Sequence, residues 1–525
     1  MGRGRARKCS LGLISAVLSY LTIYTLYTSF GNETRLRKAH EELQWVNTSS
    51  SWIDRQSCRW IGICGAFHLR SSGWRWKTQL IRDQQESSAE QSNILRTPPD
   101  ISSFWTSGDE KPESWSADER ALRDIPSYVY DYTPYVHLFS GEEFWPGDIA
   151  EHLVHTTPYL NYTPIEDLKE KRNLENLDEL NQYGNGRQTY LQSDDNVEER
   201  PQWLGGRENI PTMTGKTYNY SGPLTSPPDY ELPNVYDSDW WDVGEGDIIE
   251  HGGLRPNPTH APGVVPRSVK EELKKIVHPT YKIKSNHTGG HSSAPAVLVV
   301  VPKANGVVDA FWFYFYSYNL GNVVLNTRFG NHIGDWEHSV VRFQHGKPKA
   351  LFLSEHNFGE AYAYKAVEKI GKRPVIYSAV GTHAMYATAG VHPYVLPWGL
   401  LHDETDKGPL WDPIQNHHAY VYNHTSNEVK SSTRTPKAPI SWFNFGGHWG
   451  DKTYPLSDPR QYRFAGQYHY VSGPYGPKFK NLGRQKICQG NGKCTIKHWI
   501  GNEKVKRTTE LDHNEDLAEM HLDDA

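Results

Sequence analysis

The chain has little cysteine and little net charge for its length. Five cysteines stand among 525 residues, and the formal net charge at pH 7 is −5. So small a charge leaves no basic footprint of the kind that binds phosphate backbones, and we expect no nucleic-acid partner. At this length the chain can hold two to three average domains, or one large β-rich domain with appendages.

The few cysteines form two close pairs and one single residue. If the chain faces an oxidising lumen, small disulfide loops are expected at Cys58–Cys64 and Cys488–Cys494. Three alternatives stay open: free thiols, a metal site divided between the two pairs, and the other four-cysteine connectivities. Two cysteine pairs at this spacing are only a weak signal for zinc. Cys9 is either an inert thiol or a palmitoylation site beside an apolar run.

Aromatic residues, glycine and proline are plentiful instead. Aromatics make up 12% of the chain, with 44 glycines and 33 prolines. This composition favours many short strands and turns over long helices. The expected fold class is therefore mainly β with a few helices.

One uncharged run, Leu11–Phe30, follows a short basic segment at residues 1–10. At about 1.5 Å per residue it fits a bilayer core. The alternative is a cleaved signal peptide, whose apolar core is usually shorter and ends in small residues. Because this run ends in bulky Tyr24, Tyr27 and Phe30, the sequence favours a single uncleaved transmembrane signal-anchor behind a cytosolic tail.

Acceptor sequences for N-glycosylation all follow that run, which suits a lumenal or extracellular body. Asn161 is the weakest of them because Pro164 follows its Thr163. We expect a single-pass type II glycoprotein of the endomembrane system or vacuole membrane. The six asparagines are Asn32, Asn47, Asn161, Asn219, Asn286 and Asn423.

Composition divides the rest into a polar stem at 31–125, a body at 126–480 and an end segment at 481–525 with the second cysteine pair and an acidic tail. We expect the stem to be partly disordered, including 108–116. In the body we expect a tyrosine-rich strand over 125–139 and a short helix after Asp148. Capping boxes predict two further helices, from Thr163 and from Ser268.

Apolar runs in the body predict successive strands. The run at 296–301 is typical of a strand buried on both faces, and further strands are expected at 308–318, 331–343, 349–353 and 374–380. Three of them begin or end at polar clusters: Asp335/Glu337, Glu355/His356 and Thr382/His383. In adjacent strands these clusters could converge at one place.

The cluster in the segment NHIGDWEHSVVRF is the densest. Asp335 and Glu337, two apart on a strand, share one face. His332 joins them only if the chain turns at Gly334. Two carboxylates on one face need a cation, water or buried basic partners. In the first interpretation the two carboxylates bind a divalent cation, and Ca²⁺, Mg²⁺ or Mn²⁺ is expected. In the second they form ion pairs with Arg328, Arg342 or His338, and these pairs only set the register of the strands.

Several stretches resemble the vacuolar protein sorting-associated protein 62 family: YVYDYTPYVHLFSGEEFWPGDIAEHLVHTTP, VDAFWFYFYSYNLGN, HIGDWEHSVVRF, FLSEHNFGE and RPVIYSAVGTHAMYA. They cover roughly residues 126–450 in the family's order. The resemblance implies a membrane-associated protein linked to vacuolar protein sorting, without a catalytic mechanism to carry over. The expected function is non-enzymatic sorting, with sorting cargo, lipid or glycan as partners.

The same motif resembles a segment of the necrosis- and ethylene-inducing-like proteins, which are β-sandwich proteins that hold a divalent cation at a membrane-binding surface. That resemblance implies a β-sandwich-like lumenal body. It also implies a cation site, and the matching residues are His332, Asp335, Glu337, His356 and His383. The chain departs at Gly334, where that family has a second histidine, and Asn319 is the nearest candidate for its upstream acidic ligand. A metal-dependent hydrolase using the same residues is a further alternative.

Overall fold

A computed structural model describes residues 51–65, 68, 101, 103–166, 170–212, 289–324, 327–356, 358–394, 401–464, 466–490 and 492–500. They belong to two compact units. The smaller takes its residues from 1–94, 323–331 and 453–472, and the larger from 95–322, 332–452 and 473–525. The predicted anchor, Cys9, the helix after Ser268 and Asn32, Asn47, Asn219 and Asn286 lie outside the described residues.

Among the described residues no helix is long and apolar enough to cross a membrane. Strands and short helices dominate instead, so the expectation of a mainly β fold with a few helices is confirmed. The segment boundaries predicted from composition stay predictions. Residues 103–125, expected in the stem, pack in the larger unit, where buried Trp105 donates its indole N–H to Asp148 Oδ1 at 2.9 Å.

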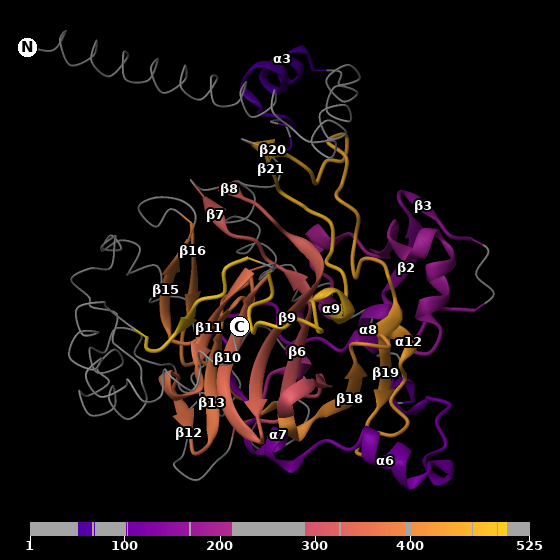
Figure 1. The fold of residues 1–525 in the computed structure, drawn as a ribbon. Helices are drawn as coiled ribbons and strands as arrows, with labels where there is room; N and C mark the ends of the chain where they lie inside the picture. The colour runs from indigo at the N-terminus through magenta and orange to yellow at the C-terminus, as the bar shows by residue number, and fades with distance from the viewer. Residues whose placement is uncertain are drawn as a thin grey trace, which may run out of the picture. The chain divides into compact units, whose positions relative to one another are not determined.

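An eight-stranded mixed sheet organises the larger unit (Figure 1). Its long antiparallel centre pairs β6 with β9, and β9 with β10, while β18 runs parallel to β5. The predicted strands at 296–301, 308–318, 331–343 and 349–353 are confirmed as neighbours in this sheet. In spatial order the strands are β19 (Glu428–Ser431), β18 (His417–Asn423), β5 (Ala296–Pro302), β6 (Val307–Asn319), β9 (His332–Gln344), β10 (Lys347–Glu355), β11 (Phe358–Ala363) and β22 (Ile496–Lys497).

A second, smaller sheet packs on one face of the first. β1 runs parallel to β13, which is the strand predicted at 374–380. Trp312 and Tyr314 of the large sheet lie in one buried cluster with Val136 and Ile376 of the small one. The strands of the small sheet are β12 (Lys369–Ile370), β13 (Arg373–Ser378), β1 (Tyr135–His137), β17 (Leu410–Trp411) and β14 (Met385–Tyr386).

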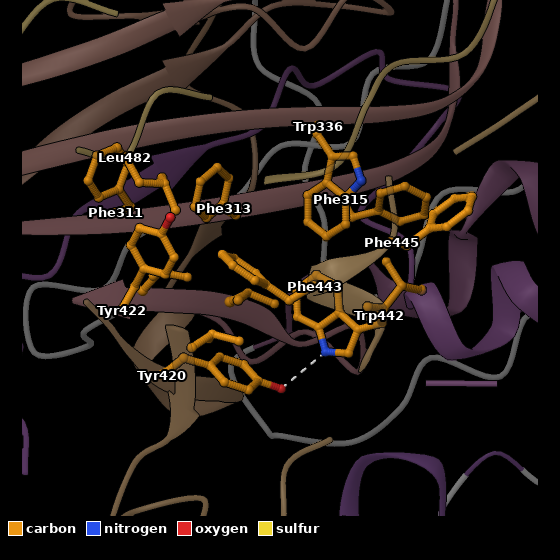
Figure 2. Packing of buried hydrophobic residues seen from close by; sticks show 14 of the residues in the cluster. Phe311, Phe313, Phe315, Trp336, Tyr420, Tyr422, Trp442, Phe443, Phe445 and Leu482 are labelled. Carbon is orange, nitrogen blue, oxygen red and sulfur yellow. Dashed lines mark hydrogen bonds between the residues drawn. The ribbon is translucent and has the colours of Figure 1, made fainter. Parts of the chain in front are cut away.

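Helices and loops cover the other face, so the expected sandwich describes this unit only in part. Figure 2 shows Phe311, Phe313 and Phe315 of β6 beside Trp336 of β9, with Trp442 and Phe443 of α12 (Ser441–Asn444) in the same cluster. Each fully buried aromatic contributes about 1.5–3 kcal/mol. β5 sends alternate residues into both clusters, which confirms a strand buried on both faces.

Shorter elements complete the two units. In the larger they are α6 (Ala117–Arg123), α7 (Ser127–Asp131), α8 (Ile149–Val154), β2 (Thr156–Leu160), β3 (Thr163–Pro164), β4 (Thr189–Ser193), α9 (Gln202–Gly205), β15 (Gly390–Pro393) and β16 (His402–Thr405), with a 3₁₀ helix at Leu177–Gln182. In the smaller they are α3 (Trp52–Ile61), β7 (Val323–Val324), β8 (Thr327–Arg328), β20 (Arg463–Phe464) and β21 (Gln467–Tyr468).

Two predicted elements are wrong, and in one of them prolines explain the difference. The tyrosine-rich strand over 125–139 is instead α7 followed by β1, because Pro126 precedes the helix and Pro134 ends the turn after it. The helix expected from Thr163 does not form in the described residues 163–166. Thr163 and Pro164 form β3, which pairs with β2 through a turn at Asn161, a residue with φ +58°. The short helix after Asp148 is confirmed as α8, whose first turn that side chain caps.

Both expected disulfides are confirmed. Cys58–Cys64 lies in the smaller unit, where both cysteines are buried with Leu456. Cys488–Cys494 lies in the larger unit. Each closes a loop of the same short length, so neither joins distant parts of the chain.

Candidate functional site

Strand ends of the larger unit bring polar residues to one place. Asp335 lies near the start of β9 and His356 in the turn that joins β10 to β11, while His383 follows β13. Antiparallel pairing sets the start of β9 beside the end of β10. One ligand atom from each of His332, Asp335 and His356 lies within 4.8 Å of the other two. The three predicted polar clusters therefore converge, as a neighbour relation between these strands implied.

The chain turns at Gly334, where φ is +67°. This left-handed residue rotates β9 so that His332 joins Asp335, although a regular strand would place residues three apart on opposite faces. A Cβ at position 334 would lie 1.7 Å from the carbonyl oxygen of Trp449. No side chain fits there, so this fold requires glycine at position 334.

The protonation of the His332 ring follows from its hydrogen bond to the backbone. Its Nδ1 lies 2.7 Å from the carbonyl oxygen of Gly334, and a carbonyl can only accept, so Nδ1 carries the proton. Burial lowers the pKa of His332 against the opposing charge of Asp335. The ring is therefore neutral near pH 7 with a lone pair on Nε2, which is the form that ligates metals. Asn319 lies opposite His332 in the β6–β9 pair and is buried.

Asp335 is held by His383. Asp335 Oδ2 accepts from His383 Nδ1 at 3.0 Å, and His383 Nε2 donates to the carbonyl oxygen of Phe144 at 2.9 Å. Burial opposes protonation, but the Asp335 hydrogen bond and the Glu142 charge raise the pKa of His383, while that bond holds the pKa of Asp335 below its usual value. Both ring nitrogens of His383 thus face protein acceptors, so in this geometry it orients Asp335 and offers no free ligand atom.

Glu142 is a member of the site that sequence reasoning missed. Its Oε2 lies 3.8 Å from His383 Nε2 and accepts from the backbone N–H of Gly381 at 2.8 Å. Its Oε1 accepts from the backbone N–H groups of Glu143 and Phe144. Burial raises its pKa against the opposing charge of His383. The segment GEEFW gives no local sign of this role, because the contacts that define it lie 239 residues away.

Glu337 is fully buried and supports His356. One carboxylate oxygen accepts from the Ser354 hydroxyl, and Oε1 accepts from the His356 backbone N–H at 2.9 Å. His356 Nδ1 lies 3.1 Å from the same Oε1. Burial alone would lower the pKa of His356, but the hydrogen bond and charge of Glu337 raise it to about 9. Glu337 therefore has both oxygens occupied and fixes the ring of His356.

His356 is also the solvent edge of the cluster, because its side chain is 37% exposed. It begins the turn between Glu355 and Phe358, with φ +57°. Two-residue hairpins with left-handed residues strongly favour Asn and Gly, and a histidine there costs about 1–3 kcal/mol. His383 is left-handed too, with φ +56°. His345, outside the cluster, has a left-handed backbone as well, so this conformation alone does not mark a functional histidine.

The remaining groups make a two-imidazole, one-carboxylate set, the rings of His332 and His356 and the carboxylate of Asp335. With its raised pKa, His356 carries a proton near pH 7 and would have to release it to bind a metal ion, so binding would be tighter at higher pH. Ligands around one ion at about 2.0–2.6 Å stand about 3–5 Å apart, so the observed spacing fits a single divalent cation. Nitrogen-rich sets favour transition metals over Ca²⁺ and Mg²⁺. Among the expected cations this geometry suits Mn²⁺, and it also admits Zn²⁺ or Fe²⁺.

More carboxylates lie near this solvent edge. Burial, together with the charges of Glu360, Asp403 and Glu337, raises the pKa of Glu355 to about 8. Asp403 is itself buried and accepts from Thr382 Oγ1 and Tyr386 at 2.8 Å. Negative charge around a site raises the local concentration of cations. The raised pKa leaves Glu355 mostly neutral at pH 7, however, and Lys480 Nζ donates to the His356 carbonyl oxygen at 3.0 Å, so these surroundings do not by themselves select a cation.

Comparison with known proteins gives consistent matches over most of the chain. The family description that matches residues 288–454 is vacuolar protein sorting-associated protein 62. Vacuolar protein sorting-associated protein TDA6 of Saccharomyces cerevisiae is 34% identical over 431 residues, which cover 74% of this chain and 74% of that protein. Vacuolar protein sorting-associated protein 62 of the same yeast is 31% identical over 407 residues, 72% of this chain and 71% of that protein.

Solved structures give weaker matches. Necrosis and Ethylene inducing Protein 2, from the agent of cocoa's Witches Broom disease, aligns with 15% identity and a TM-score of 0.15. That alignment covers 21% of this chain and 53% of the other. NLPPya in complex with mannosamine aligns with 11% identity and a TM-score of 0.17, over 34% of this chain and 70% of that one. Scores this low do not establish a shared fold.

Proposed function

The chain belongs to the vacuolar protein sorting-associated protein 62 family, and from this premise we propose that it acts in sorting proteins to the vacuole. The proposed form is a non-enzymatic, membrane-anchored glycoprotein with its body in the lumen of the endomembrane system. The names of its relatives support the sorting role, and the apolar run at 11–30 followed by glycosylation sequences supports the topology.

The cation site is the part of this proposal that the geometry supports best. The main observation in its support is that His332, Asp335 and His356 each place one ligand atom within 4.8 Å of the other two. The supporting contacts point the same way: Gly334 fixes the His332 ring, and Glu337 fixes the His356 ring. Ligating imidazoles commonly have such carbonyl and carboxylate partners. A bound divalent cation with open positions at the exposed edge of His356 would then hold an anionic or hydroxyl-rich group of a lipid or glycan.

Metal analysis of the purified chain tests the site. Wild type is expected to retain about one equivalent of Mn²⁺ or Zn²⁺ after desalting, and Asp335→Asn to lose it. Asp131, a carboxylate that is 54% exposed, supplies the control Asp131→Asn, which should retain the metal. Equal metal content in wild type and Asp335→Asn would remove the cation site from the proposal.

A separate experiment tests sorting. In a yeast strain that lacks both relatives, secretion of a vacuolar hydrolase is measured with and without this chain. Rescue by wild type and by Asp131→Asn, with loss of rescue in Asp335→Asn, is expected. If wild type fails to restore sorting while it is expressed and folded, the sorting role fails, and the metal analysis above still decides the cation site on its own.

A metal-dependent hydrolase is the second candidate function, since two imidazoles and a carboxylate also occur in catalytic metal sites. The hydroxyl beside the cluster, that of Ser354, is fully buried and donates to Glu337, so it is not placed to attack a substrate from solvent. Metal-dependent turnover of an ester, phosphoester or glycoside that disappears in Asp335→Asn would favour this candidate over the non-enzymatic one.

A further inference from the structure

Helix α3 of the smaller unit turns three large apolar side chains to solvent. Trp52 is 65% exposed, Ile53 72% and Trp60 64%. At about 100° per residue the three lie within an arc of roughly 100° on the helix surface. Cys58 and Asp54, on the opposite side, are buried at 2% and 4% exposure. The helix is therefore amphipathic with its apolar aromatic face outward, the reverse of an ordinary surface helix.

The protein holds this face in a fixed conformation. Ser51 caps the first turn by accepting from the Asp54 backbone N–H at 3.2 Å, and Gly62 ends the helix with φ +66°. The Cys58–Cys64 disulfide links the helix to the strand-like segment that follows, and both cysteines are buried with Leu456. A free helix of this length is marginal in water, so these contacts keep three exposed apolar side chains in place that the helix does not need for its own core.

The charge around the face is basic. Arg59 is exposed in the last turn, while the acidic residue of the helix, Asp54, is turned inward. Tryptophan, isoleucine and arginine on one face match the chemistry of the lipid interface, where indole rings sit at headgroup level and guanidinium groups contact phosphate. A glycan would need free hydrogen-bonding groups beside the rings, but the indole N–H of Trp60 already donates to Gln56 Oε1 at 2.8 Å.

We propose that α3 lies flat in the headgroup layer of a phospholipid bilayer, with Trp52, Ile53 and Trp60 inserted and Arg59 at the phosphates. The sequence supports this occupant, because the apolar run predicted to cross a membrane ends at Phe30 and residues 31–51 join it to the helix. That linker reaches about 30 Å as a helix and about 70 Å extended. A tether this short gives a weak interfacial helix a high effective concentration of bilayer. The proposal shares the anchor with the proposed function and is independent of the cation site.

Lipid photolabelling of the full chain tests the proposal. The chain is reconstituted in vesicles of phosphatidylcholine and phosphatidylserine that contain a lipid with a diazirine near the glycerol backbone, and labelled peptides are mapped by mass spectrometry. The α3 peptide is expected to carry at least tenfold more label than the α6 peptide with Leu122, a leucine of equal exposure, 65%, in the larger unit. The triple variant Trp52→Ser/Ile53→Ser/Trp60→Ser should lose this label, and Leu122→Ser and Asp335→Asn should keep it.

Two results overturn the proposal: labelling of residues 11–30 with α3 at the level of the Leu122 peptide, or cross-linking of α3 to a second copy or another protein in place of lipid. If the triple variant fails to form the Cys58–Cys64 disulfide, the wild-type label decides alone. If residues 11–30 do not insert, the proposed topology fails, and label on α3 of chain added to preformed vesicles still decides the role of the helix.

Discussion

The imidazole of His383 and the carboxylate of Asp335 lie 3.0 Å apart although 48 residues separate them in the sequence. The other ring nitrogen of His383 donates to the Phe144 carbonyl, so the ring bridges a loop and a strand and holds one oxygen of Asp335. An oxygen of Asp335 also lies within 4.8 Å of a ring nitrogen of His332 and of His356. An outer contact of this kind decides how a metal ligand is oriented and how basic it is.

Replacement of His383 should therefore weaken metal binding without removing a ligand. His383→Asn keeps a residue type that tolerates the left-handed backbone, φ +56°, but cannot reach both Asp335 and Phe144. The expected result is a loss of about 10–100-fold in Mn²⁺ or Zn²⁺ affinity, measured by competitive chelator titration. The control is His345→Asn, at an exposed residue with φ +47°. An unchanged affinity in His383→Asn would show that Asp335 needs no such support.

Gly334 is the position at which the site depends most directly on backbone geometry. In Gly334→Ala the new Cβ would meet the Trp449 carbonyl oxygen at 1.7 Å and would also strain φ. The chain must shift, so both folding stability and the approach of His332 to Asp335 should be lost. Gly330→Ala is the matched control: φ is +84° there, but nothing lies within 4 Å of its Cβ.

The expected costs in the free energy of unfolding are about 1–2 kcal/mol for Gly330→Ala, from backbone strain alone, and several kcal/mol for Gly334→Ala. Chemical denaturation gives the first comparison and metal retention the second. Equal costs for the two variants would contradict the close contact with Trp449.

How far the sequence predicts this protein depends on the distance over which each feature is determined. Strand patterns are local, and β5, β6, β9, β10 and β13 follow directly from their apolar runs. The turn at Gly334 could also be predicted, because His332 reaches Asp335 only if the chain turns there and a glycine makes such a turn easy. The strand expected over 125–139 failed because an aromatic-rich pattern outweighed two prolines, Pro126 and Pro134, whose effect is equally local.

The rest of the site could not be predicted, because it is determined by contacts between distant segments. Glu142 joins only because its carboxylate caps the backbone at Gly381, and nothing in its own segment distinguishes it from Glu143. The roles within the cluster were equally hidden. Glu337 and Asp335 lie two residues apart on β9, but Ser354 and the His356 backbone occupy the oxygens of Glu337, whereas an oxygen of Asp335 lies within 4.8 Å of a ring nitrogen of His332 and of His356.

Metal removal should lower thermal stability if the cluster binds a cation only in the folded state. At a free metal concentration of 100 times Kd the stabilisation is about 2.7 kcal/mol, which for a domain of this size is a few degrees in Tm. The measurement is a thermal melt of wild type with and without excess EDTA, followed by restoration with Mn²⁺ or Zn²⁺. In Asp335→Asn the two curves should coincide; a shift of equal size in that variant would mean that the chelator acts elsewhere.

Acid should destabilise the larger unit through buried neutral histidines. His152 is fully buried between Trp203 and Phe315, and burial, with His155 nearby, lowers its pKa to about 3. In the unfolded chain a histidine titrates near 6.5. Between those values the unfolded state binds a proton that the folded state does not, so stability falls as pH drops below about 6.5, by about 2 kcal/mol at pH 5 for this one residue.

The variant His152→Phe removes the group that binds this proton in the unfolded state and keeps an aromatic ring in the same pocket. Its unfolding free energy should fall less steeply than that of wild type between pH 6.5 and 5. His418, stacked on Trp105, has its pKa lowered to about 3 mainly by burial, so a second change, His418→Phe, should reduce the slope further and roughly additively. The slopes come from denaturant titrations at fixed ionic strength. Parallel pH curves for wild type and both variants would contradict this account.

Glycosylation should distinguish the two acceptor sequences that the structure describes, Asn161 and Asn423. The amide of Asn161 is engaged on both sides, since Nδ2 donates to Gln188 and Oδ1 accepts from Lys452, and Pro164 follows its Thr163. Asn423 is exposed at the end of β18 and uses only Oδ1, which accepts from the backbone N–H groups of Thr425 and Ser426. In a lumenal body the transferase should therefore modify Asn423 and pass over Asn161.

Asn423→Gln is expected to remove one endoglycosidase-sensitive step of gel mobility, and Asn161→Gln none. If neither variant nor endoglycosidase changes the mobility of the full chain, the body does not face the lumen, and the topology on which the sorting proposal rests is lost.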